Sequence, residues 1–150
     1  MPMPGNLRIS EILGSSEKEN REGTIDVFEV DHALNQPIDP TTGMRTGVRI
    51  HSPMRVTCII DKATPALFKA TATGRTFPTV ILEFYRIDPD TRSEVKYYEV
   101  TMRIVRIVSI VPFVPNTLKA ENEALRHMIQ YSFVYEEIEW NYMPDSMVET

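Results

Sequence analysis

The sequence has a single cysteine, Cys58, and only three histidines among its 150 residues. One cysteine excludes an internal disulfide framework. The wide spacing of His32, His51 and His127 does not fit the ligand patterns of structural zinc. The chain also contains no nucleophile elbow, no phosphate-binding loop and no glycine-rich dinucleotide turn. We therefore expect no bound metal, no cofactor and no catalytic site.

Long apolar runs and an excess of positive charge are missing as well. No run approaches the roughly 20 residues of a membrane-spanning helix, and the first residues, M-P-M-P-G-N, have neither the basic nor the apolar region of a signal peptide. The 21 acidic residues outnumber the 16 basic ones, which gives a formal net charge of -5. These features predict a protein without membrane insertion or nucleic-acid binding that is not exported by a cleaved signal peptide.

What remains has the patterns of a β protein. Residues 54–60 alternate between apolar and polar side chains and place Cys58 on the apolar face, which indicates a buried structural thiol rather than a nucleophile. Residues 24–32 and 79–87 are apolar on both faces, as expected of strands that are covered on both sides or that face a neighbouring subunit. The length fits one domain with its own hydrophobic core.

One helix is predicted at about residues 64–73. Thr64 is the expected N-cap, Pro65 suits the first helical position and Gly74 provides a left-handed end. About two and a half turns are too few to be stable alone in water. The helix must therefore pack on the β body, through an apolar stripe formed by Ala63, Leu67 and Ala70.

The last strand changes the parity of its apolar residues. They occupy odd positions from 129 to 135 and even positions from 138 to 142, which predicts a β-bulge near Glu136–Glu137. The nearby carboxylates, including Glu139, fit a solvated or interface face of an edge strand better than a pair of catalytic acids.

Residues 36–53 form the most unusual segment, with three prolines and two glycines. Loops longer than about 12–15 residues are uncommon in compact domains and are usually functional or disordered. A flexible excursion is one interpretation. Met44, Val48 and Ile50 are apolar for a solvated loop, however, and favour an arm that docks on another surface.

Several blocks, taken in their order and spacing, resemble the haemolysin-coregulated protein (Hcp) family, the tube-forming component of bacterial type VI secretion systems. The resemblance extends from about Leu7 to Tyr142. Its blocks are I-L-G-S-S at 12–16, R-E-G-T-I-D-V-F-E-V-D-H at 21–32, I-D-P-T-T-G-M-R-T-G-V-R-I-H-S-P at 38–53, D-K-A-T-P-A-L-F-K-A-T-A-T-G at 61–74, F-Y-R-I at 84–87 and Y-E-E-I-E-W-N-Y at 135–142.

The resemblance implies a mainly β fold, a compact two-sheet β-barrel with one short α-helix and a long extended loop. It further implies homo-hexameric rings that stack head-to-tail into a tube. Such a tube assembles in the cytoplasm at a baseplate, inside a contractile sheath, and is tipped by a spike protein (VgrG-type). It is secreted when the sheath contracts and carries or chaperones effector proteins in its lumen.

The long loop corresponds to the extended loop of the family, which reaches an adjacent ring or subunit. The expected ring-stacking or subunit-interface residues are Asp39, Pro40, Thr41, Thr42, Gly43, Met44, Arg45 and Thr46. Two alternatives remain at this point. One is a tail-tube protein of a phage or another contractile injection system, and the other is a small β-barrel enzyme or ligand-binding module.

Overall fold

A computed structural model describes residues 5–16, 22–114, 116, 118–120 and 127–142, and the backbone of 147–149. The described chain forms nine strands and one helix. These are β1 (Gly5–Ile9), β2 (Ile25–Asp31), β3 (Leu34–Asn35), β4 (Ile50–His51), β5 (Met54–Ile59), α1 (Thr64–Thr73), β6 (Thr76–Ile87), β7 (Glu94–Phe113), β8 (Met128–Tyr142) and β9 (Met147–Glu149).

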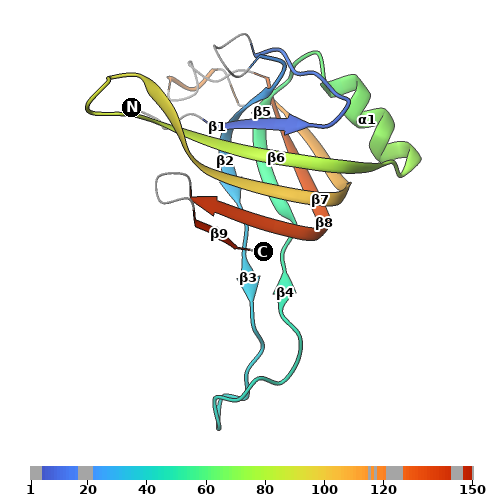
Figure 1. The fold of residues 1–150 in the computed structure, drawn as a ribbon. Helices are drawn as coiled ribbons and strands as arrows, with labels where there is room; N and C mark the ends of the chain where they lie inside the picture. The colour runs from blue at the N-terminus through green and yellow to red at the C-terminus, as the bar shows by residue number, and fades with distance from the viewer. Residues whose placement is uncertain are drawn as a thin grey trace.

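Six of the strands close into a barrel (Figure 1). Their order is β5-β2-β1-β6-β7-β8, and β8 returns to pair with β5. Every pairing is antiparallel. The first residues of β8 pair with β5, and its last three pair with β9. The predicted mainly β barrel with one short helix and a long extended loop is confirmed, but the barrel strands form one closed sheet rather than the two sheets expected.

The barrel interior is filled by side chains from all six strands. Its largest fully buried members include Tyr131, Phe77 and Phe133. Cys58 is 0% exposed, as predicted for a core thiol. Strand β2 is not covered on both sides within this chain, because Phe28 on its outer face is 60% exposed.

The helix ends where the sequence indicates but begins differently. The N-cap residue is Ala63, which makes no side-chain capping bond, so the predicted Thr64 cap is wrong. Thr64 instead accepts a hydrogen bond from the Asp61 N–H (3.1 Å), and its hydroxyl lies 3.2 Å from that of Tyr131. Because the Thr64 hydroxyl is engaged in these contacts, it does not cap the backbone N–H groups of the first helical turn. Gly74 adopts the expected left-handed conformation, with a φ of 71°.

The packing stripe of the helix is confirmed. Its three predicted residues are at most 3% exposed, and they join the barrel core, where α1 contacts β7. Among the described residues, no helix combines the length and hydropathy needed to cross a membrane.

The predicted β-bulge near Glu136–Glu137 is wrong, although the buried face of β8 does change parity between Phe133 and Ile138. The pairing of β8 with β7 keeps one register across this point. Strand β7 changes parity at the same level, at Ile104, whose φ is 56°. Because both strands change parity at the same level, neither gains a residue relative to the other and the register is kept. The register shift between these strands occurs instead at Val108. The pattern in β8 alone could not show that its partner changes parity too.

Candidate functional site: the arm and its root

A long arm, residues 33–52, leaves the barrel between β2 and β5 and extends well beyond it (Figure 1). Its two sides pair as β3 and β4, where Leu34 opposes His51 and Asn35 opposes Ile50. A second bridge joins Ile38 to Arg45 near the far end. The segment is a two-stranded ribbon with its own hydrogen bonds.

The tip of the arm is a compact turn made by the eight residues that the family resemblance indicates, 39–46. The Asp39 N–H donates to the Met44 carbonyl, and the Gly43 N–H donates to the Asp39 carbonyl, both at 2.7 Å. The Asp39 carboxylate also accepts from the Thr41 N–H at 2.8 Å. Gly43 has a φ of 73°, in the left-handed region that glycine adopts without strain.

The arm exposes an unusual amount of apolar surface. Met44 is 69% exposed and Val48 is 83% exposed, and every residue from 40 to 50 is exposed. Other large apolar side chains along the ribbon are also exposed, namely Leu34, Ile38 and Ile50. Large apolar side chains that are exposed together on one segment are typical of an interaction site.

The side chain of Gln36 holds the two sides of the ribbon together. Its amide nitrogen donates to the Gly47 carbonyl at 2.8 Å, and its amide oxygen accepts from the Arg45 guanidinium at 3.1 Å. Arg45, which is one of the predicted site residues, is therefore oriented by the arm itself.

Polar contacts fix the root of the arm in two ways. The Ser52 hydroxyl accepts from the Ala33 N–H at 2.7 Å and donates to the Ala33 carbonyl at 3.0 Å, which ties the two sides to each other. The Tyr135 hydroxyl of β8 lies 2.6 Å from His32 Nε2 and 2.7 Å from His51 Nδ1, which ties both sides to the barrel.

Sequence reasoning missed this His–Tyr–His cluster. His32 and His51 are distant in sequence and appear unrelated there, but in the fold their ring centroids are 6.4 Å apart. Tyr135 comes from the opposite end of the chain. No local spacing could have revealed the cluster, because it depends on the closure of the barrel between β5 and β8.

Burial lowers the pKa of His32, and the neighbouring His51 lowers it further, while the Asp31 carboxylate acts in the opposite direction. Burial also raises the pKa of Tyr135, against the opposing effect of the Arg49 charge. The pKa shifts of His32 and Tyr135 both favour the neutral groups at neutral pH.

A cleft of about 720 Å³ separates the returning side of the arm from the barrel wall. It is lined by Arg45, Val48, Arg49, His51, Arg103, Tyr135, Glu136, Glu137, Ile138 and Trp140. The lining mixes both charge signs with apolar groups. Glu136 and Glu137 are exposed in it, and Glu139 is paired with Arg103 at 3.1 Å.

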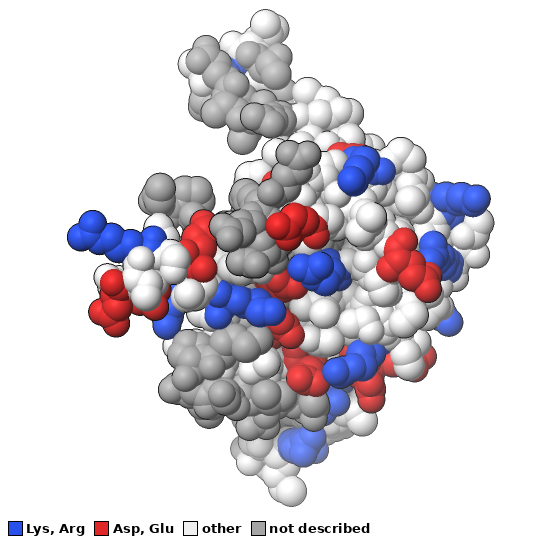
Figure 2. All heavy atoms as spheres, turned by 45° about the horizontal axis from the view of Figure 1, so that its top comes forward, with Lys and Arg blue, Asp and Glu red and all other residues white. Residues whose placement is uncertain are grey.

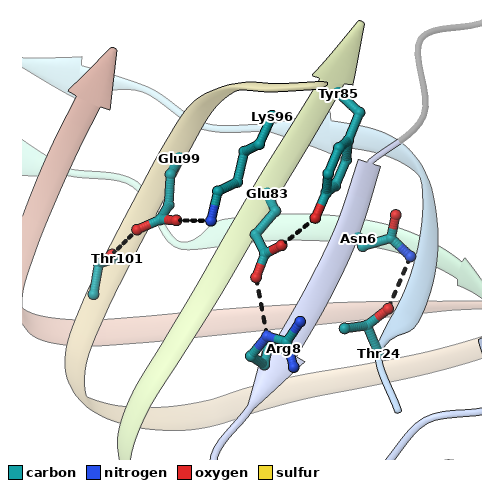
Figure 3. Close-up of polar contacts among 8 residues, drawn as sticks. All are labelled: Asn6, Arg8, Thr24, Glu83, Tyr85, Lys96, Glu99 and Thr101. Atoms are coloured by element: carbon teal, nitrogen blue, oxygen red, sulfur yellow. Dashed lines mark hydrogen bonds and ion pairs between the residues drawn. The ribbon is translucent and has the colours of Figure 1, made fainter. Parts of the chain in front are cut away.

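A second polar cluster lies on the barrel wall formed by β1, β6 and β7 (Figure 3). Glu83, only 3% exposed, accepts hydrogen bonds from Arg8 Nε at 3.0 Å and from the Tyr85 hydroxyl at 2.5 Å. Beside it, Lys96 pairs with Glu99 at 2.7 Å. Burial raises the pKa of Glu83, but the hydrogen bonds and the positive charges of Arg8 and Lys96 together outweigh it, and the net effect is a lowered pKa.

Outside these clusters the surface charges are mixed. Figure 2 shows basic and acidic side chains interspersed over the described part of one face, without a broad area of one sign. Among the described residues, no three His, Cys, Asp or Glu side chains are grouped to hold a metal ion. A barrel whose interior is packed with side chains, together with an ordered arm that exposes apolar residues, is typical of a subunit that binds other protein chains.

Comparisons with known proteins identify the kind of subunit. The family described as "Type VI secretion system effector, Hcp" matches residues 6–142. The "Major exported protein" of Pseudomonas aeruginosa is 29% identical over 130 residues, which cover 87% of this chain and 75% of that protein.

Solved structures agree with this match. A mutant of Hcp1 from the E. coli EAEC 042 pathovar is 32% identical, with a TM-score of 0.83, and the match covers 99% of this chain and 96% of that one. A crystal structure of an Hcp protein has a TM-score of 0.86 at 22% identity, over 98% of this chain and 95% of that one, and shows the shared fold.

The chain belongs to the Hcp family of type VI secretion systems. This confirms the family resemblance and the expected function of a type VI tube subunit. The family match favours this function over a phage tail-tube protein and over a ligand-binding module.

Proposed function

We propose that copies of this chain assemble into hexameric rings that stack head-to-tail into a hollow tube, and that the tip of the arm, Asp39–Thr46, makes the contact with the adjacent ring or subunit. The observation that carries this proposal is the arm itself. It is hydrogen-bonded along its length, projects away from the barrel and exposes apolar side chains such as Met44 and Val48. An ordered apolar projection is stabilised when a second chain covers it.

The distribution of other exposed apolar residues supports a ring. Phe28 lies on β2, whereas Val108 and Val111 lie on β7 and Val134 on β8, and all four are exposed. In the closed barrel, β1 and β6 lie between β2 and β7 on one side and β5 and β8 on the other, so that β2 and β7 are on opposite sides. Two apolar faces on different sides suit a head-to-tail contact, in which one face of each subunit meets the other face of its neighbour. Such contacts close into rings when the rotation allows it.

The work of this assembly is mechanical rather than catalytic. The tube forms in the cytoplasm at a baseplate, inside a contractile sheath, and a VgrG-type spike caps it. Contraction of the sheath then expels the tube from the cell, with effector proteins carried in the lumen. A tube that is assembled and later expelled needs contacts that can form and break. An arm that buries only a few apolar side chains provides a small contact of this kind.

The direct test replaces the apolar and the basic residue at the tip, Met44→Ser with Arg45→Ser. We expect rings of unchanged mass that no longer stack, because the tip loses its exposed apolar side chain and its charge. A matched control changes Phe68 and Lys69 to serine, an adjacent apolar and basic pair exposed on α1. Stacking and secretion that survive the change at the tip would contradict the proposed role of the arm.

A further inference from the structure

Arg49 determines the positions of the protons in the cluster at the root of the arm. Its Nε–H donates to His51 Nε2 at 3.1 Å, and a guanidinium nitrogen is always a donor. His51 Nε2 must then accept, so the ring proton of a neutral His51 is on Nδ1. That Nδ1–H donates to the Tyr135 oxygen at 2.7 Å.

The remaining hydrogen bond follows from the same reasoning. Because the Tyr135 oxygen accepts from His51, its own O–H is free to donate to His32 Nε2 at 2.6 Å. His32 then also carries its proton on Nδ1. The result is one directed chain of donors from Arg49 through His51 and Tyr135 to His32, in which both imidazoles are neutral.

This chain links three segments that are distant in sequence. His32 directly follows β2, Arg49 and His51 lie on the returning side of the arm, and Tyr135 belongs to β8. Both sides of the arm are therefore held against the same tyrosine of the barrel wall. The contacts between the His51 and Tyr135 rings, which are perpendicular with centroids 5.3 Å apart, strengthen this hold.

We propose that His32, Tyr135 and His51 are positioning residues, which fix the direction of the arm relative to the barrel while His32 is neutral and release it when His32 is protonated. The release of the arm is independent of the proposed function. Its consequence, the loss of ring stacking below neutral pH, rests on that function.

Protonation of His32 breaks the chain at an identifiable atom. A second proton on His32 would turn Nε2 into a donor, so it could no longer accept the hydrogen bond from the Tyr135 O–H. Water would screen the new charge less than at an open surface, because His32 is partly buried.

The cluster is surrounded by charged groups of both signs. The acidic ones are Asp31 on β2 and Glu136 and Glu137 on β8, and the basic ones are Arg45 on the arm, Arg55 on β5, opposite Asp31, and Arg103 on β7. Burial and His51 lower the pKa of His32 despite Asp31. Because the folded pKa lies below the ordinary value of 6.5, the stabilisation is complete above that pH and is lost as the pH falls through the folded pKa.

Solid-state NMR of the ¹⁵N-histidine-labelled protein tests the proton positions in the assembled state. At about pH 8, above the ordinary histidine pKa, we expect two imidazoles with the proton on Nδ1 and His127 as an internal reference. Tyr135→Phe should remove the preference of His32 for this form. A wild-type spectrum in which His32 or His51 carries its proton on Nε2 would overturn the proposal.

The second measurement follows the arm as the pH is lowered. Trp140 is the only tryptophan of the chain and lines the same cleft as His51 and Tyr135, so its fluorescence reports the position of the arm. We expect a change in Trp140 emission as the pH falls below 6.5 in the wild type. His127→Gln should keep this change, and Tyr135→Phe should show the low-pH emission at every pH.

Light scattering on the same samples separates the two claims. A Trp140 transition accompanied by loss of stacking supports both the positioning role and the proposed function. A Trp140 transition without any change in stacking supports the positioning role and contradicts the stacking role of the arm. Two results would overturn the positioning role. One is a wild-type Trp140 emission that does not change with pH, and the other is a pH response of Tyr135→Phe equal to that of the wild type.

Discussion

Arg8 and Glu83 form an ion pair between β1 and β6, with Arg8 Nε 3.0 Å from Glu83 Oε1, although the Glu83 side chain is only 4% exposed. A buried carboxylate is costly unless several donors satisfy it. Here the Tyr85 hydroxyl provides the second donor. The pair and its tyrosine therefore stabilise the barrel wall as one unit (Figure 3).

Tyr85→Phe tests the contribution of that second donor. The change removes a hydrogen bond to a buried charged group, and we expect the free energy of unfolding to fall by about 1.5–3 kcal/mol. Urea denaturation followed by circular dichroism measures this. Tyr97→Phe is the matched control, because the Tyr97 hydroxyl makes no hydrogen bond among the described residues. Equal effects of the two changes would contradict the role of Tyr85.

The same cluster predicts how stability depends on acid. The folded pKa of Glu83 is lowered from its ordinary value of 4.5, so its stabilisation is complete above that pH and is lost as the pH falls through the folded pKa. In Glu83→Gln, which has no titrating group there, the free energy of unfolding should fall less steeply in acid than in the wild type. Parallel acid limbs of the two stability profiles would show that Glu83 does not contribute.

Cys58 should be inert in the native protein. It is 0% exposed, and burial raises its pKa, with Asp61 and Asp26 acting in the same direction, so the thiolate is scarce. A thiol reagent at about pH 8, close to the pKa of a free thiol, should label it only as the chain unfolds in denaturant. Val48→Cys in a Cys58→Ala background provides an exposed control that should react at once. Rapid labelling of native Cys58 would contradict its place in the core.

Gly14 is required by a close approach between two segments. A Cβ atom at this position would lie 2.3 Å from the Thr24 carbonyl oxygen. Gly14→Ala should therefore destabilise the fold by about 1–3 kcal/mol or more. Gly47→Ala, in the arm, has nothing within 4 Å of the added atom, and we expect a change within about 0.5 kcal/mol. Denaturation midpoints of the two variants decide the comparison, and similar midpoints would contradict it.

The sequence predicted those parts of the fold that depend on local pattern. The alternation in residues 54–60 placed Cys58 in the core, and the helix was located through Pro65, Gly74 and its apolar stripe. Each of these features depends on residues that belong to the same helix or the same strand.

The errors and omissions arise from contacts between distant segments. Thr64 is not the cap because it packs against Tyr131. The parity change in β8 is matched by Ile104 in β7, which a single strand cannot reveal. Likewise, His32 and His51 meet at Tyr135 only once the barrel has closed.

The most direct test of the tube assembly is size-exclusion chromatography with light scattering on the purified protein, combined with negative-stain images. We predict a mass near six times 17.2 kDa, annular particles and concentration-dependent stacks. A monomer that persists at high concentration, without annular particles, would contradict it.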